Sequence, residues 1–157
     1  MIVHDHLLGR FFMRHAFTAI SATALVALGL TACSDANVFD IAVGSCASSE
    51  SFADSEQGLV EELPLIDCEE PHDLEAIAST EIDGDEYPGE AAVTSQADEF
   101  CVAEFEDFVG ISYEESELVV NYFAPTADTW DQIGDREILC WLITPELVEG
   151  SQEGAAR

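Results

Sequence analysis

Few side chains in this sequence have types suited to catalysis once its many carboxylates are set aside. Beyond residue 32 the chain holds one histidine, His72, and no lysine. A Ser-His-Asp or Cys-His catalytic site would therefore have to use His72 as its base. None of the short motifs of nucleophile elbows, zinc proteases or phosphate-binding loops accompanies it. We expect His72 to lie in a loop and to hydrogen-bond the backbone or Glu75, with a catalytic base or ligand as the alternative.

The second group with distinctive chemistry lies in residues 124–136, which join two apolar runs. Arg136 is the one guanidinium in this carboxylate-rich region. We therefore expect a structural clamp that pairs with Asp135, Asp131 or an acid across the sheet, in preference to a ligand-binding arginine. For Trp130, packing over a sheet edge is favoured over a platform for carbohydrate.

The carboxylates dominate the charge of the chain. Asp and Glu number 33 against 4 Lys and Arg, which gives a net charge of −29. Such a field repels phosphate, so nucleic acid is excluded as a partner, whereas cations or a basic partner would be attracted. The acidic turn at residues 83–86 lacks the twelve-residue loop of a calcium site, and one carboxylate pair among so many does not indicate a glycosidase. No metal and no cofactor is predicted.

The first 32 residues have the pattern of an export signal. Arg10 and Arg14 precede an apolar run over residues 17–30, about 21 Å of helix against a hydrocarbon core of about 30 Å. The run ends in Leu-Thr-Ala-Cys at residues 30–33, which resembles a bacterial lipobox. The resemblance implies acylation of Cys33 and cleavage before it, and two or more acyl chains would form a stable anchor. We expect a lipid-anchored protein on the extracytoplasmic face of the cell membrane, with an ordinary signal peptide as the alternative.

Four cysteines remain once Cys33 is set aside. An even number in an exported domain indicates two disulfides, for which three connectivities exist. We favour Cys46–Cys68 and Cys101–Cys140, because each closes the shorter loop. A zinc site is the alternative, disfavoured by the missing C-x2-C spacing and by an oxidising compartment.

The apolar pattern predicts an α+β fold, with a small antiparallel or mixed sheet of four to five strands packed by one long helix and two disulfides. Strands are expected at residues 41–43, 59–67, 74–82, 118–123 and 138–143, the last of them central because it is apolar on both faces. The helix is expected over residues 90–108, where apolar side chains recur at helical spacing: Val93, Ala97, Phe100, Cys101, Phe105 and Phe108.

These elements predict a simple domain organisation. Residues 1–32 form the lipoprotein signal, 33–40 a lipidated tether and 41–145 one domain. Residues 146–157 lose the apolar pattern, and we expect them to form a solvated, disordered tail.

Several short pieces recur in an order that resembles a known family. They are Gly44-x-Cys46, Cys68-x2-Pro71-His72-x2-Glu75, Tyr87-Pro88-Gly89, Cys101, and Pro125-Thr126-x3-Trp130-x3-Gly134-Asp135-Arg136-x3-Cys140. Together they cover about residues 38–144 and resemble the septum formation domain of actinobacterial envelope proteins and lipoproteins. The resemblance implies an extracytoplasmic module linked to the division septum, without established catalytic residues. Many relatives are expected to carry a membrane-spanning helix, and here the lipobox takes its place.

Three functions follow from these observations. The first is a non-enzymatic, lipid-anchored interaction or structural module with an unknown envelope protein as partner, in which His72 and Trp130 are buried in packing roles. The second is a ligand-binding lipoprotein that captures a cation or basic peptide with carboxylates lining a concavity. The third is an extracytoplasmic hydrolase, which requires a serine and a carboxylate within reach of His72.

Overall fold

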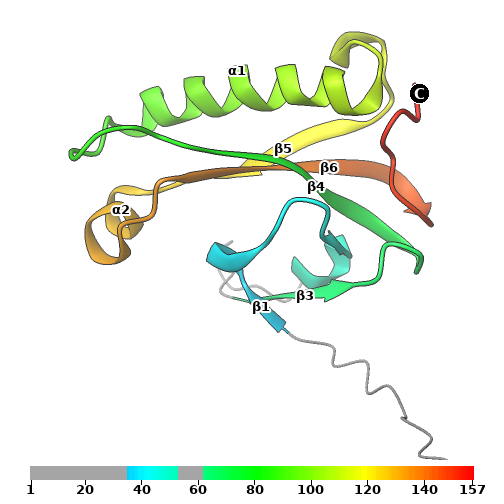
Figure 1. Ribbon diagram of the computed structural model, residues 1–157, viewed down its shortest axis with the longest axis horizontal. Coiled ribbons are helices and arrows are strands. Elements are labelled where there is room, and N and C mark those ends of the chain that lie inside the picture. Colours follow the sequence, from blue (N-terminus) through cyan, green and yellow to red (C-terminus); the bar gives the residue numbers. More distant parts are fainter. Residues whose placement is uncertain (1–34, 53–61) are drawn as a thin grey trace, which may run out of the picture. The chain divides into compact units, whose positions relative to one another are not determined.

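The structure, a computed structural model, describes residues 35–52 and 62–157 (Figure 1). The predictions for the export signal and for acylation of Cys33 lie outside these residues. Within the described ranges, no helix has the length and apolar character needed to cross a membrane.

The centre of the fold is an antiparallel sheet with the strand order β1-β3-β2-β4-β6-β5. Its strands are β1 (Asp35–Asn37), β2 (Cys46–Ala47), β3 (Glu62–Ile66), β4 (His72–Glu81), β5 (Val119–Phe123) and β6 (Glu137–Val148). The helices are α1 (Glu90–Val109) and α2 (Ala127–Ile133), with the short 3-10 turns η1 (Val38–Asp40), η2 (Ser49–Phe52) and η4 (Tyr113–Glu115). The predicted α+β class is therefore confirmed, and the short β1 extends the five-stranded sheet at its edge.

Strand β6 lies between β4 and β5, as its apolar sequence predicted. Its side chains alternate between two apolar clusters, with Ile138, Cys140 and Leu142 on the side of α1. Leu139 and Trp141 face the opposite cluster, which also contains residues of β2, β3 and β4. Because both faces of the strand are covered, neither face carries a polar set. Figure 1 shows α1 over one face of β4, β5 and β6, with β1 and β3 on the opposite side.

Helix α1 buries one stripe of side chains at four-residue spacing: Val93, Ala97, Cys101, Phe105 and Val109. The helix ends at Gly110, whose φ of 88° is left-handed and whose N–H donates to the carbonyl of Glu106. Cys101 is joined to Cys140 of β6, with their Cα atoms 5.5 Å apart. The second disulfide joins Cys46 to Cys68. The pairing favoured from the loop lengths is confirmed.

The start of the domain differs from the prediction. The strand expected at residues 41–43 is wrong, because the chain turns at Gly44 (φ 88°) and the strand forms only at Cys46 and Ala47. Ile41 is buried as an anchor of the loop rather than as part of a strand. The expected tether is also wrong over residues 35–37, since they pair with β3.

The expectation of a domain boundary at 145 and a disordered tail over residues 146–157 is wrong. Strand β6 continues to Val148, which pairs with His72. The chain then runs back toward the end of α1 (Figure 1), where Gly154 donates to Phe108 O at 2.8 Å and Ala156 to Val109 O at 2.9 Å. Because backbone hydrogen bonds hold this segment in place, its order does not depend on a regular pattern of apolar side chains.

A buried carboxylate completes the attachment of the C-terminal segment. The backbone N–H of Gln152 donates to Glu75 Oε2 at 2.8 Å, and both residues are buried. Burying a carboxylate is costly unless it accepts hydrogen bonds. The C-terminal segment therefore supplies the N–H donor that satisfies the buried carboxylate of Glu75 in β4.

We predict that the amides of Gly154 and Ala156 exchange with deuterated solvent at least about tenfold more slowly than in an unstructured peptide, because both donate to carbonyls at the end of α1. Native-state hydrogen exchange measures this. A Glu75→Ala variant removes the acceptor of the Gln152 amide and should lower the protection of that amide. Exchange of Gly154 and Ala156 at the peptide rate would show that the segment is solvated.

Candidate functional site

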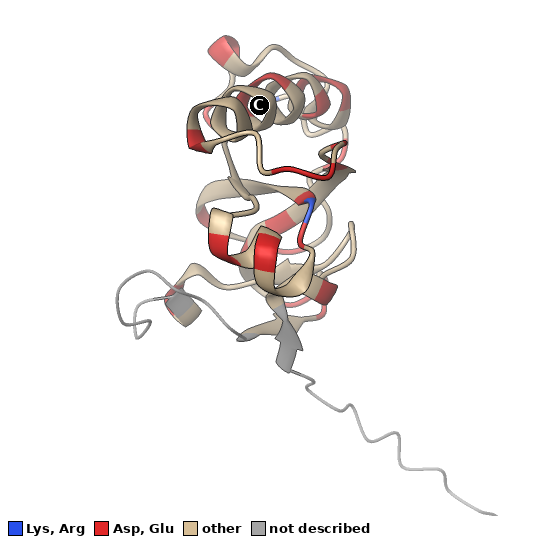
Figure 2. Cartoon of the chain, turned by 90° about the vertical axis from the view of Figure 1, so that its left-hand side faces the viewer, with Lys and Arg blue, Asp and Glu red and all other residues tan. Residues whose placement is uncertain are grey.

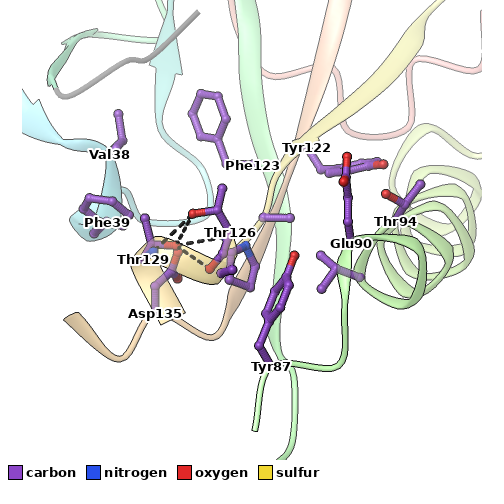
Figure 3. A pocket seen from close by; sticks show the side chains of 14 residues that line it. Val38, Phe39, Tyr87, Glu90, Thr94, Tyr122, Phe123, Thr126, Thr129 and Asp135 are labelled. Carbon is purple, nitrogen blue, oxygen red and sulfur yellow. Dashed lines mark hydrogen bonds between the residues drawn. The ribbon is translucent and has the colours of Figure 1, made fainter. Parts of the chain in front are cut away.

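A groove of about 660 Å³ lies where the start of α1, the end of β5, α2 and η1 meet. Its lining is mostly apolar or aromatic, with two carboxylates, and consists of Val38, Phe39, Tyr87, Glu90, Val93, Thr94, residues 122–127, Thr129 and Asp135. Figure 3 shows Val38, Phe39 and Phe123 on one side of β5, and Tyr122, Glu90 and Thr94 on the side of α1. The groove therefore extends across both faces of the sheet at the end of β5.

Helix α2 forms one wall of this groove and was not predicted. Thr126 caps its start, because the Thr126 hydroxyl accepts from the N–H of Thr129 at 3.1 Å and the Thr129 hydroxyl accepts from the N–H of Thr126 at 2.9 Å. The helix ends at Gly134, with φ 74°. Thr126 and Gly134 were the residues in the sequence that could have indicated this helix.

Trp130 is the anchor beneath α2. Its ring is 2% exposed, and Nε1 donates to the carbonyl of Asp85 at 3.3 Å. The Tyr87 ring meets it edge to face, with centroids 5.7 Å apart. The ring is therefore part of the core. The carbohydrate platform, which would require an exposed ring, is ruled out, and packing is the role of this side chain.

Arg136 acts as a clamp, although its partners differ from the prediction. The guanidinium carbon lies 3.4 Å from the centroid of the Trp130 ring. Nη1 donates to the carbonyl oxygens of Trp130 at 3.2 Å and of Asp135 at 2.8 Å. Among the residues that the structure describes, no carboxylate lies within ion-pair distance of it. The carbonyls near the end of α2 lack helical partners, and they take the guanidinium instead.

Asp135 links the clamp to the sheet. Its Oδ1 accepts from the backbone N–H of Glu137, the first residue of β6, at 3.1 Å. Asp135 also lines the groove. Asp135, Arg136 and Trp130 are thus brought together at the end of α2, and the stacking of Arg136 on Trp130 was not predicted.

His72 does not line the groove. It begins β4 rather than lying in a loop, is 1% exposed and bonds the carbonyl of Glu70 through Nδ1 at 2.8 Å. This confirms the expected bond to the backbone. Nε2 is buried, and over the described ranges it has no hydrogen-bond partner. The serine and carboxylate that a hydrolase would need are therefore not in contact with His72 in that part of the chain.

The acidic residues are spread over many elements. Figure 2 shows them on both helices and on several loops, not at one point of the surface. Within residues 35–52 and 62–157, no cluster of three or more His, Cys, Asp or Glu side chains is placed to hold a metal ion. The carboxylates that line the groove are Glu90 and Asp135.

Burial raises the pKa of the Tyr122 phenol above its ordinary value of 10.0, and the Asp98 carboxylate raises this pKa further. A hydrogen bond with Thr94 acts in the opposite direction. We predict that Asp98→Asn lowers the pKa of Tyr122, measured by phenolate absorbance with Tyr122→Phe to assign the transition. If the pKa of Tyr122 were unchanged in Asp98→Asn, the interaction between Asp98 and Tyr122 would be contradicted.

The direction of this shift determines its effect on stability. A phenol whose pKa is raised on folding stabilises the fold fully below pH 10, and this contribution is lost as the pH rises through the folded pKa. The free energy of unfolding should therefore fall more steeply above pH 10 in the wild type than in Tyr122→Phe.

Residues 42–156, more than half of the chain, match the model of the family described as septum formation. The chain belongs to the septum formation family. The resemblance carried by its cysteines and by the Pro-Thr-x3-Trp segment is thereby confirmed. No curated protein and no solved structure matches the chain.

The part of the chain that matches the septum formation family contains most of the groove. The lining from Tyr87 to Asp135 lies inside the match, whereas Val38 and Phe39 precede it. Sequence reasoning identified Asp135 and the neighbouring Trp130 and Arg136. It missed Glu90, Tyr122 and the other lining residues, because they come from segments that only the fold brings together.

Proposed function

We propose that this member of the septum formation family is a non-enzymatic module of the cell envelope, anchored by lipid on Cys33, which binds another envelope protein during septum formation. The family match supports the link to division. The lipobox-like residues 30–33 support the anchor. The proposal assigns the chain to the extracytoplasmic face, where its two disulfides are stable.

The observation that carries the non-enzymatic role is the use of the distinctive side chains in packing. His72 and Trp130 are both almost fully buried, and the guanidinium of Arg136 stacks on Trp130. A catalytic site needs such groups to face a substrate. The groove offers instead an open, largely apolar surface with two carboxylates, and exposed apolar surface of this kind is typical of protein interaction sites.

Capture of a basic peptide is the alternative function, and one observation favours it. Glu90 and Asp135 both line the groove, and no lysine or arginine does. In this alternative the chain binds a free peptide, not a neighbouring protein of the envelope. Isolation of the bound molecule separates the two functions.

The proposed function is tested in the source organism by immunofluorescence and by deletion of the gene. We expect the protein to concentrate at septa, and the deletion strain to misplace or delay them. A Cys33→Ala protein should leave the membrane fraction and fail to restore septation. An even distribution over the envelope together with normal septa in the deletion strain would overturn the link to septation.

A separate variant tests the absence of catalysis. We expect His72→Ala to restore normal septation in the deletion strain, provided that its circular dichroism shows a folded protein. A folded His72→Ala protein that fails to restore septation would argue for chemistry at His72.

A further inference from the structure

The groove continues into an open edge of the sheet. Strand β5 is the last in the strand order and pairs with β6 through residues 119–123. No other strand of the described residues lies on its second side. Val119 is 48% exposed and Asn121 is also exposed. An edge of this kind presents backbone groups to which another chain can add a strand.

The direction of the backbone groups in β5 can be read from one hydrogen bond. The N–H of Tyr122 donates to the Oδ1 of Asn121 at 2.8 Å. In an antiparallel ladder, alternate residues direct their N–H and C=O toward and away from the neighbouring strand. Tyr122 therefore faces away from β6, and Val120, two residues earlier, does the same. These two residues carry the backbone groups that an added strand would bond. At Tyr122 the added strand would have to displace Asn121 Oδ1 from the N–H.

The groove supplies a place for the side chains of such a strand. Tyr122 and Glu90 line it on the side of α1, while Phe123 and Val38 line it on the opposite face of the sheet (Figure 3). Successive side chains of an extended segment point to opposite faces. A segment added beside β5 would thus place alternate side chains in the two halves of the groove.

Charge decides which partner fits. The groove carries the carboxylates of Glu90 and Asp135 and no lysine or arginine, in a chain of net charge −29. A second copy of this chain would bring the same negative charge and be repelled. A segment with lysine or arginine among its apolar residues complements both the walls and the carboxylates.

We propose that β5 and the groove bind an extended, basic segment of a partner protein, which joins the sheet as a strand beside β5. This mode combines backbone hydrogen bonds, which supply affinity, with side-chain pockets, which supply specificity. The proposal rests on the function proposed above, in which the chain is an interaction module, and it names the surface and the chemistry of the partner.

The test uses the full chain purified in detergent and fluorescence anisotropy with a labelled ten-residue peptide. The peptide alternates Val-Val and Lys-Lys pairs, so that each face of its extended form carries both residue types. We expect saturable binding that weakens as salt is added. Two control peptides, one with glutamate in place of lysine and one N-methylated at alternate amides, should each bind at least about tenfold more weakly.

A matched pair of variants locates the site. Glu90→Lys should weaken binding of the Val-Lys peptide at least about fivefold. Asp107→Lys changes the net charge equally on the exposed surface near the other end of α1, and should change the affinity less than about twofold. Circular dichroism of each variant shows that it is folded.

Three results would overturn this inference: no binding of the Val-Lys peptide up to about 1 mM, equal binding of the N-methylated peptide, or equal weakening by Asp107→Lys and Glu90→Lys. None of these results decides whether the protein is found at septa, because that is measured separately in cells. A failure of strand addition is therefore distinguishable from a failure of the proposed function.

Discussion

Replacing Cys101 and Cys140 together by alanine is expected to lower the free energy of unfolding by about 4 kcal/mol. This bond closes a loop across a sequence separation of 39 residues and joins α1 to β6. Without this bond the unfolded chain has more conformational entropy, and this favours unfolding. Small domains have a total stability of about 5–15 kcal/mol, so the loss removes between about a quarter and four fifths of that stability.

Urea denaturation of the oxidised proteins measures this effect. The Cys46→Ala/Cys68→Ala variant is the matched control, since its loop spans 22 residues. The chain-entropy relation then predicts a loss smaller by about 0.5 kcal/mol. A Cys101→Ala/Cys140→Ala protein with the urea midpoint of the wild type would contradict the bond between helix and sheet.

Trp130→Ala is expected to cost about 3–5 kcal/mol, the second large effect. The substitution leaves a cavity beneath α2, removes the bond to the Asp85 carbonyl and exposes the guanidinium of Arg136 to a void. Trp130→Phe retains much of the packing and loses the Nε1 hydrogen bond, so its cost should be clearly smaller. A loss below about 1 kcal/mol for Trp130→Ala would mean that the ring is not part of the core.

The contact between Trp130 and Arg136 is measured by a double-mutant cycle. Trp130→Ala, Arg136→Met and the double variant should give a coupling energy of about 1–2 kcal/mol, because the guanidinium stacks on a buried ring. Additive effects of the two substitutions would contradict the clamp.

The elements that could be predicted are those whose burial follows a regular period. Helix α1 is evident from the stripe that runs from Val93 to Phe105, since every fourth residue faces the sheet. Strand β6 is evident because both of its faces are covered. Helix α2 has seven residues and a single buried side chain, Trp130, so no period can form. Thr126 and Gly134 are suited to the start and end of a helix, but neither residue alone indicates one.

The parts that could not be predicted depend on contacts between distant segments. The C-terminal segment is held by backbone donors and by the carboxylate of Glu75, which lies 77 residues earlier than Gln152. Arg136 was expected to pair with a carboxylate, yet its Nη1 donates to the backbone carbonyls of Asp135 and Trp130. The groove combines residues from η1, α1, β5 and α2, and no local pattern brings those four elements together.

The function proposed above requires that this chain is lipid-anchored at Cys33 on the extracytoplasmic face. Intact mass spectrometry of the protein extracted from membranes tests it most directly, with thiol alkylation before extraction. We expect a species that begins at Cys33, carries acyl chains and has no alkylated thiol. A membrane-extracted species that retains residues 1–32 without acyl mass, or one alkylated at Cys46, Cys68, Cys101 and Cys140, would contradict it.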